Sequence, residues 1–180
     1  MDDNISLSQM VEKAKYAYEV EDFEESARWY DRASSQYLLQ NDRVNAAEMD
    51  NNRSVCLLRS GNPHAALAAA KGTEKVFAEI GDLHRQAMAL GNQAAALEAM
   101  QRPDEAISMY QQSNELLKQV EDHELRIFVL QSLSGLQLKR RQFLQALATM
   151  QAALDLKQKL TIRERILKKL LQIVFSLLGR

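Results

Sequence analysis

The sequence repeats itself at intervals of forty residues, and this period constrains the fold more than any other feature. Short turn-like stretches begin at four positions with this step: Glu21, Gly61, Gln101 and Arg141. A second series with the same step begins at Asn41, Gly81, Glu121 and Thr161. A fixed period of this length is typical of repeat proteins, in which each unit buries its apolar face against its neighbours. The period therefore predicts a stack of four similar units.

Several columns hold only small side chains when the chain is written in rows of forty residues. Three of them are Ser26, Ala66, Ala106, Ala146; Ala14, Ser54, Ala94, Ser134; and Ala33, Thr73, Ser113, Ala153. Small side chains let two helix backbones approach closely, while larger residues fill the space beside them. The columns therefore predict equivalent close helix contacts in every repeat.

Each row contains two helices separated by a short turn. Apolar residues between Phe23 and Tyr37 are spaced by three and four positions, which places them on one helix face. Gly61 can end one helix, Asn62 can cap the next, and Pro63 suits its first turn. The pattern predicts an all-α chain whose helix pairs stack into an α-solenoid.

The period divides the chain into three parts. We expect residues 1–6 to form an N-terminal tail, residues 7–160 four repeats, and residues 161–180 a C-terminal helix equal to half a repeat. The start of the chain has no basic flank and no apolar run, so we expect no signal peptide. A lone Cys56 forms no internal disulfide, which favours a cytoplasmic location.

Charge is distributed unevenly, although the net charge is only −1. Residues 1–50 carry twelve acidic and five basic side chains, whereas residues 139–180 carry two acidic and ten basic ones. This asymmetry indicates an elongated dipole or different partners at the two ends, and ordinary solvated faces are the alternative.

A turn followed by small and aromatic residues resembles the tetratricopeptide repeat. Phe23–Ser26 and Pro103–Ala106, each followed four residues later by a tyrosine, carry the resemblance, and Ala89–Ala95 is similar to a first helix of the long-helix subgroup. That subgroup has a period of forty residues and includes kinesin light chains and bacterial Rap regulators. The resemblance covers residues 7–160 and implies a right-handed α-solenoid of four tetratricopeptide-like helix pairs plus a C-terminal helix. It implies less about function, because a fold does not fix a function.

The resemblance also implies a non-catalytic scaffold that binds a partner protein, as a peptide or a helix, in a concave groove lined by first helices. Asparagines matching Asn52 and Asn92 bind the peptide backbone in the subgroup, and an amide suits this role because it both donates and accepts. The alternative is that they bond neighbouring helices. The residues expected in the groove are Asn52, Val55, Leu58, Arg59, Met88, Asn92, Phe128, Gln131, Leu138 and Lys139. This mixture suits a partner with apolar anchors and some acidic character.

Motifs for catalysis or cofactor binding are absent from the sequence. There is no Gly-rich phosphate loop, and the three histidines stand in different repeats without a second ligand at helical spacing. Cys56 lies on an apolar helix face, where packing is the expected role. The basic run Lys139–Arg141 lacks interleaved aromatic residues. We therefore expect no enzyme activity, no metal, no cofactor and no nucleic acid partner.

The last segment of the chain is its most apolar one, with nine apolar residues among the thirteen from Ile166 to Leu178. It is shorter than the ~20 residues that a membrane-spanning helix needs. In the forty-residue register, the residues expected to pack backward on the fourth repeat are Leu167, Leu170, Val174 and Leu177. The surplus apolar residues expected to mediate self-association are Ile166, Leu171, Ile173, Phe175 and Leu178.

Terminal repeats normally carry a polar outer face, and this segment does not. We expect a homodimer with two-fold pairing of the last helices, since this is the commonest oligomer symmetry. A partner protein, a downstream domain or folding back into the groove would cover the same apolar face. The alternative function is a peripheral membrane-surface adaptor, in which Arg163, Arg165, Lys168 and Lys169 face an anionic surface.

Overall fold

The computed structural model describes residues 5–177, which contain ten α-helices and no strand. In chain order they are α1 (Leu7–Glu19), α2 (Phe23–Leu39), α3 (Arg43–Arg59), α4 (Pro63–Ala70), α5 (Thr73–Glu79), α6 (Leu83–Ala99), α7 (Pro103–Gln119), α8 (His123–Lys139), α9 (Phe143–Leu156) and α10 (Ile162–Leu177). The all-α prediction is confirmed. Leu178 of the expected self-association set and residues 1–4 of the expected tail lie outside the described residues.

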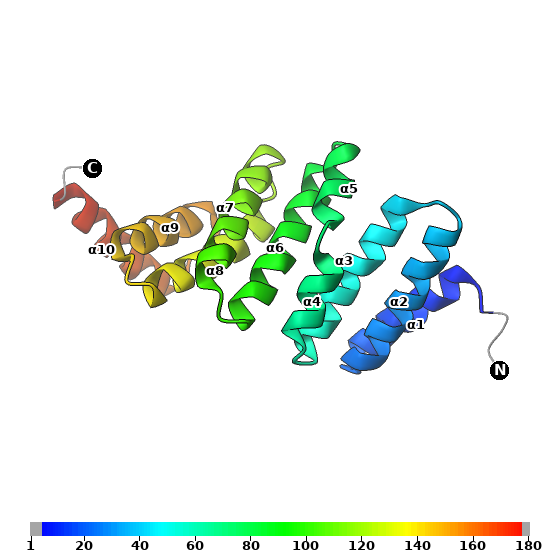
Figure 1. Ribbon diagram of the computed structural model, residues 1–180. Coiled ribbons are helices and arrows are strands. Elements are labelled where there is room, and N and C mark those ends of the chain that lie inside the picture. The colour runs from blue at the N-terminus through cyan, green and yellow to red at the C-terminus, as the bar shows by residue number, and fades with distance from the viewer. Residues whose placement is uncertain (1–4, 178–180) are drawn as a thin grey trace.

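The helices form hairpins that stack side by side along an elongated molecule (Figure 1). α1 pairs with α2, α3 with α4 and α5, α6 with α7, and α8 with α9, while α10 follows at the far end. Four hairpins and a last helix make the predicted α-solenoid. The stack places α1 and α10 at opposite ends of the molecule (Figure 1).

The turns between successive helices share one backbone geometry. One residue in each of seven turns has a positive φ between 56° and 81°: Glu21, Asn41, Gly61, Gly81, Gln101, Glu121 and Arg141. The next residue caps the following helix in most turns, as Asp22 accepts from the backbone of Glu25 and Asn62 from that of Ala65. Gln142 makes no such bond at the start of α9. The repeated turns fix the antiparallel packing of successive helices.

Three serines of the small columns show why these positions stay small. Ser26, Ser113 and Ser134 are buried, and their hydroxyls donate to carbonyl oxygens of the paired helix at 2.8, 2.8 and 3.0 Å. Each bond satisfies a buried polar group and requires a close approach of two backbones. A larger side chain at these positions would separate the two helices of a hairpin.

Larger side chains fill the space between neighbouring hairpins. Tyr110 of α7 packs with Val129 and Leu133 of α8, and Tyr30 of α2 packs with Cys56 of α3. Burial raises the pKa of both tyrosines to about 12, so their hydroxyls stay protonated. Cys56 is buried as predicted, and burial raises the pKa of its thiol. It is therefore a packing residue rather than a reactive thiolate.

The second helix of the second repeat differs from the prediction of one helix, because it is broken into two. α4 ends at Ala70 and α5 begins at Thr73. Between them Lys71 is extended and Gly72 has a φ of 93°, a left-handed value that favours glycine. The chain therefore leaves the helix for two residues and then resumes it.

Side chains replace the backbone hydrogen bonds that the break removes. The Ala70 carbonyl accepts from the Thr73 hydroxyl at 2.7 Å and from the amide of Gln93, on α6, at 3.2 Å. The same Gln93 amide donates to the Glu74 carboxylate at 2.7 Å, which also accepts from the Gly72 backbone at 2.8 Å. Gln93 is 7% exposed, so a buried side chain of the next repeat stabilises the break.

The last helix packs on α9 through a side that differs from the predicted one. Leu171 is 3% exposed there, and Leu167 and Phe175 are half-buried beside it. The prediction that Leu171 belongs to an outward self-association face is therefore wrong. Phe175 lies on the same inward side, so it is also partly covered.

Three of the four residues predicted to pack backward are exposed instead. Leu170, Val174 and Leu177 are 54%, 37% and 81% exposed. Compared with the predicted register, α10 is rotated about its axis so that these side chains face solvent. The prediction of a fifth first helix in register with the others is therefore wrong in its orientation.

Two cations explain why α10 leaves the register. Arg165 and Lys169 stand forty residues after Leu125 and Val129, which pack in the core between α7 and α8. Docking α10 in the same orientation would bury two cations without a counter-charge, and burying an unpaired charge is costly. α10 keeps both cations exposed and turns Leu171 inward instead.

Candidate interaction surfaces

The first helices of repeats two, three and four are α3, α6 and α8, and we call their exposed sides the first-helix face. Polar side chains connect these helices. Asn92 of α6 donates to Asn51 of α3 at 2.9 Å, and Lys139 of α8 binds Glu98 of α6 at 3.0 Å. These contacts hold the three helices as neighbours.

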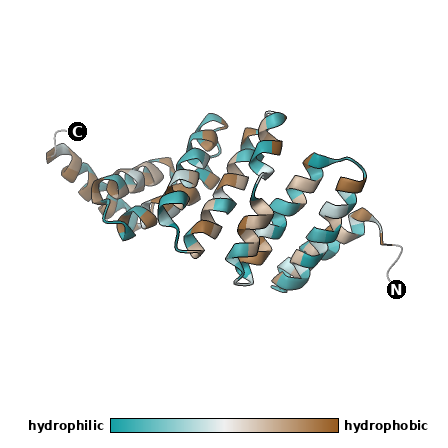
Figure 2. Ribbon diagram, in the orientation of Figure 1, coloured by the Kyte–Doolittle hydropathy of each residue, from teal (hydrophilic) through white to brown (hydrophobic). Residues whose placement is uncertain are grey.

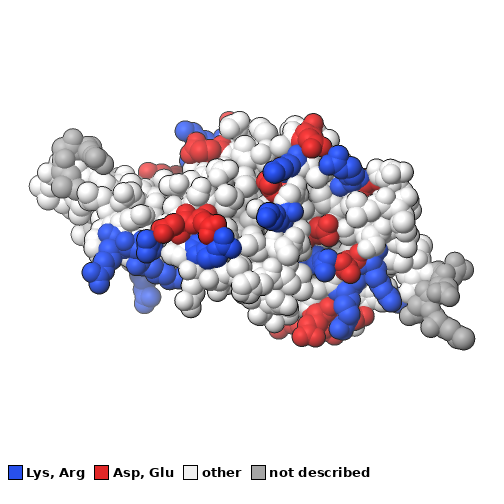
Figure 3. Space-filling model, in the orientation of Figure 1, with Lys and Arg blue, Asp and Glu red and all other residues white. Residues whose placement is uncertain are grey.

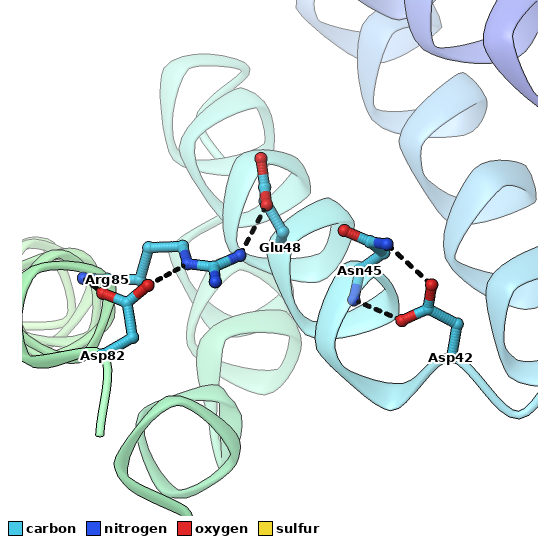
Figure 4. Close-up of polar contacts among 5 residues, drawn as sticks. All are labelled: Asp42, Asn45, Glu48, Asp82 and Arg85. Atoms are coloured by element: carbon cyan, nitrogen blue, oxygen red, sulfur yellow. Dashed lines mark hydrogen bonds and ion pairs between the residues drawn. The ribbon is translucent and has the colours of Figure 1, made fainter. Parts of the chain in front are cut away.

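Arg85 links α3 to α6 near the start of both helices (Figure 4). Its guanidinium donates to the carboxylates of Asp82 at 2.7 Å and Glu48 at 2.9 Å. Asn45, the equivalent residue of α3, bonds Asp42 through both its backbone and its side chain. Backbone N–H bonds at the helix starts are the main reason that the pKa values of Asp42 and Asp82 are lowered. Both carboxylates therefore stay ionised and hold the helix ends in place.

The predicted groove residues of α3 are mostly half-buried. Asn52, Val55 and Leu58 have this intermediate exposure. Arg59 is exposed, but its guanidinium lies 4.6 Å over the ring of Phe23, at the start of α2. Arg59 therefore joins the first two repeats at their turn end.

Asn92 of α6 has the role that the sequence left as the alternative, a bond to a neighbouring helix. Its side-chain nitrogen binds Asn51, which is 4% exposed. The side-chain oxygen of Asn92 makes no hydrogen bond within residues 5–177. Met88, one turn earlier on α6, is half-buried.

α8 is the most open part of the first-helix face. Phe128 is 60% exposed and Leu138 is 39% exposed, and Gln131 lies exposed on the same side of the helix. Lys139 is also exposed, and its ammonium group is paired with Glu98. The structure therefore brings these four predicted residues together on one helix.

Apart from Asn92, the residues that link the first helices were not predicted from the sequence to do so. They are Glu48 with Arg85, Asn51 with Asn92, and His84 with Asp122, whose side chains lie 2.9 Å apart. These pairs are 37, 41 and 38 residues apart, close to the repeat period. Polar residues about one period apart were the signal that could have identified them.

α10 presents a second candidate surface, which we call the α10 stripe. It consists of Ile162, Ile166, Leu170, Ile173, Val174 and Leu177, each at least 37% exposed. Hydrophobic residues recur along α10 at the C-terminal end of the ribbon in Figure 2. Of the residues expected to mediate self-association, Ile166 and Ile173 belong to the α10 stripe. The exposed cations Arg163, Arg165 and Lys169 flank it, and Lys and Arg side chains gather near this end in Figure 3.

Two ion pairs attach α10 to the segment before it. Lys168 binds Asp155 at 2.6 Å, and Lys157 binds Glu164 at 2.5 Å. The Lys157 contact, together with bonds from Thr161, lowers the pKa of Glu164 to about 2. Both acids near α10 are therefore already engaged by cations.

Two features are absent from the part of the chain that the structure describes, a metal cluster and a membrane-spanning helix. Nowhere in residues 5–177 do three His, Cys, Asp or Glu side chains gather as metal ligands would. Across the same residues, no helix combines the length and the apolar character needed to cross a membrane.

Known proteins match the third and fourth repeats in sequence and the whole stack in structure. Residues 85–159 match the sequence model of the tetratricopeptide repeat family. No curated protein sequence matches the chain.

Three solved structures share the fold. RapI in its apo form superposes with a TM-score of 0.78 at 14% identity, over 83% of this chain and 55% of RapI, so this chain spans about half the length of RapI. Kinesin light chain-like repeats of Podosopora anserina superpose with a TM-score of 0.73 at 12% identity, over 96% of this chain and 92% of theirs. BtubC from P. vanneervenii superposes with a TM-score of 0.63 at 17% identity, over 94% of this chain and 82% of BtubC. At these identities the likeness shows the fold alone.

Stacked helical hairpins of this geometry define an α-solenoid, a class whose members generally bind other proteins. Within that class, the family match over residues 85–159 and the fold shared with the three similar structures confirm the resemblance predicted from the sequence: this chain contains tetratricopeptide repeats.

Proposed function

We propose that this chain is a scaffold that binds a peptide or helix of a partner protein on the first-helix face. The observation that carries the proposal is the exposure of Phe128 and Leu138 on one side of α8, with Gln131 between them. Apolar anchors beside amide groups are typical of surfaces that recognise a peptide.

Amide groups supply the polar part of the proposed site. Asn52 makes no hydrogen bond within the described residues, so both its donor and its acceptor are available to a peptide backbone. Asn92 offers only its oxygen, because Asn51 occupies its nitrogen. Asn52 is therefore the stronger candidate for backbone recognition.

Charge contributes less to the proposed recognition, because the charged residues of the face are already paired. Arg85 is neutralised by Glu48 and Asp82, and Lys139 by Glu98. Arg59 remains as the cation that an acidic side chain of the partner would meet. Peptide binding should therefore weaken only slightly as salt rises.

Peptides selected from a random phage-displayed library against the whole chain would supply probes for this site. Calorimetry with a selected peptide should show at least tenfold weaker binding to Phe128→Ala and to Asn52→Ala. Gln111→Ala on α7, exposed and on a second helix, is the matched control and should bind as tightly as the wild type. Equal affinity for all three variants would refute the proposal.

We also propose that the scaffold acts without catalysis and in the cytoplasm. The first proposal is supported by the usual role of this fold, and the second by the single cysteine, which is buried at Cys56.

Self-association is a second proposed function, and the α10 stripe favours it. Six exposed apolar side chains on one helix are more than a solvated surface usually presents together. We propose that a second copy of the chain covers them, as in the expected homodimer. Light scattering of the whole chain tests this proposal, and a single chain mass at high concentration would contradict it.

The membrane-surface alternative rests on Arg163, Arg165 and Lys169 beside the α10 stripe. Co-sedimentation with phosphatidylserine vesicles, but not with phosphatidylcholine vesicles, would favour that alternative. Failure to sediment with either would remove it.

A further inference from the structure

The α10 stripe combines apolar side chains with cations that lack a counter-charge. Arg163, Arg165 and Lys169 form no ion pair within residues 5–177, and the two acids near them, Asp155 and Glu164, are held by other lysines. A surface that covers this stripe gains most if it supplies carboxylates as well as apolar contacts.

A symmetric pair of α10 helices supplies the apolar contacts but no carboxylate. The only acid of α10 is Glu164, which already binds Lys157 and carries bonds from Thr161. Two copies of the helix would therefore bring six cations of the same kind to one interface. Like charges at an interface oppose association.

The other end of the molecule has the complementary composition. A hollow of about 390 Å³ lies between α1 and α2, and its apolar lining comes from Tyr16, Ala17, Val20 and Trp29. Tyr16 is 67% exposed and Val20 is 55% exposed. This end therefore offers apolar side chains to a helix placed across it.

The same hollow is lined by three acidic residues and one basic residue: Glu12, Asp22, Glu25 and Lys13. The ammonium group of Lys13 lies 4.5 Å over the Trp29 ring. Glu12 and Glu25 already bind Lys15 and Arg28, at 3.0 and 2.8 Å, so the free negative charge at this end lies mainly beside the hollow.

Further acids surround the hollow at the turn between α1 and α2. Glu19, Glu21 and Glu24 are exposed there, and none of them forms an ion pair with another described residue. The three free carboxylates at this end equal the three free cations beside the α10 stripe in number and are opposite to them in charge.

We propose that the α10 stripe of one copy docks on the α1–α2 end of a second copy, so that the chains associate head to tail. The proposal rests on the self-association proposed above and names the surface that covers the stripe. A contact between two different surfaces leaves one free end on each side of the pair, so association continues beyond the dimer.

Two double variants disrupt the two surfaces separately. Ile166→Ser with Ile173→Ser removes apolar contacts of the stripe, where both residues are more than half exposed. Tyr16→Ser with Val20→Ser does the same at the α1–α2 end. Ile80→Ser is the matched control, since Ile80 is 50% exposed and lies in the middle of the stack. All five side chains are exposed enough for the variants to fold.

Light scattering and sedimentation velocity should show the wild type and the Ile80→Ser control exceeding twice the chain mass as concentration rises. Each double variant alone should have an association constant at least tenfold lower. An equimolar mixture of the two double variants should form one-to-one pairs and nothing larger, because one intact head meets one intact tail. Raising the salt concentration should weaken the wild-type association.

Two results would overturn the inference in distinguishable ways. If the Tyr16→Ser, Val20→Ser variant associates like the wild type while the α10 variant does not, self-association through α10 stands and the head-to-tail arrangement fails. If the wild type has one chain mass at all concentrations, both proposals fail.

Discussion

Gln93→Met tests whether a side chain of the third repeat stabilises the helix break of the second. Gln93 is buried on α6 and donates to the Ala70 carbonyl and to the Glu74 carboxylate. Methionine has a similar length and fills a similar volume, but it donates no hydrogen bond. The substitution therefore removes the two bonds while leaving the packing nearly unchanged.

The expected loss follows from the chemistry of the two bonds. A hydrogen bond to a carboxylate contributes about 1.5–3 kcal/mol and one between neutral groups about 0.5–1.5 kcal/mol. Burial of the thioether in place of an amide returns roughly 1 kcal/mol. The free energy of unfolding should therefore fall by about 2 kcal/mol, which lowers the melting temperature by about 4–8 °C in a chain of this size.

Urea unfolding followed by circular dichroism measures this difference. Gln131→Met is the matched control, because Gln131 is exposed on α8, and its free energy of unfolding should change by less than about 0.5 kcal/mol. If Gln93→Met is no more destabilising than Gln131→Met, the reasoning that Gln93 supports the break is refuted.

Three further predictions concern single residues. The side-chain oxygen of Gln137 is buried without a hydrogen-bond donor among the described residues, and leucines hold the equivalent positions of earlier repeats, Leu57 and Leu97. Gln137→Leu should therefore raise the urea midpoint and stabilise the fold by about 1–2 kcal/mol. A lower midpoint would count against this. Gly91→Ala should stabilise α6 by about 0.5–1 kcal/mol, because alanine favours a helix and its Cβ would lie at an ordinary contact distance, 3.7 Å, from the Ser113 hydroxyl. Gly72→Ala should destabilise the fold by about 1 kcal/mol, because Gly72 has a left-handed φ of 93°. Thermal melts that rank the two variants in the opposite order would contradict both predictions. The pKa of Glu164 is lowered to about 2 from its ordinary 4.5, so its contacts stabilise α10 docking above about pH 4.5 and are lost as the pH falls toward 2. The protection factors of α10 amides, which correct for the pH dependence of intrinsic exchange, should fall over that range in the wild type more than in Glu164→Gln, and identical profiles would disprove the linkage.

The repeat architecture could be predicted from the sequence because its causes are local and periodic. Caps such as Asp22 and Asn62, and small residues such as Ser26 and Ser113, act within one hairpin and recur at the same spacing. The break at Gly72 could not be predicted in this way, because a lone glycine is compatible with a helix interior. Part of its stabilisation comes from another repeat, through Gln93.

The orientation of α10 depends on charges rather than on the apolar pattern. Apolar residues surround most of this helix, so the register of Leu170 and Val174 alone favoured the wrong side. Comparison of Arg165 and Lys169 with their buried counterparts in α8 would have corrected it. The apolar pattern identified the segment as unusual, and the charged residues determine which side it buries.

The candidate groove was predicted at the level of helices and not of contacts. The register placed Phe128, Gln131 and Leu138 on an open side of α8, where the structure has them. It could not show that Asn51 occupies the amide nitrogen of Asn92, or that Arg59 stacks on Phe23. Such pairings depend on side-chain rotamers and on the spacing between repeats, which a single sequence does not encode locally.

The left-handed residues of the turns give this protein a margin for engineering heat tolerance. Five of them are not glycine: Glu21, Asn41, Gln101, Glu121 and Arg141. A left-handed conformation costs a non-glycine residue about 1–2 kcal/mol. Substitution by glycine removes this cost, although part of the stabilisation is lost because glycine makes the unfolded chain more flexible. Apart from Glu21, which belongs to the acidic α1–α2 end, each of these residues can be changed by itself, away from the first-helix face and the α10 stripe. A thermostable form could be assembled one turn at a time without redesigning the surfaces proposed to bind partners.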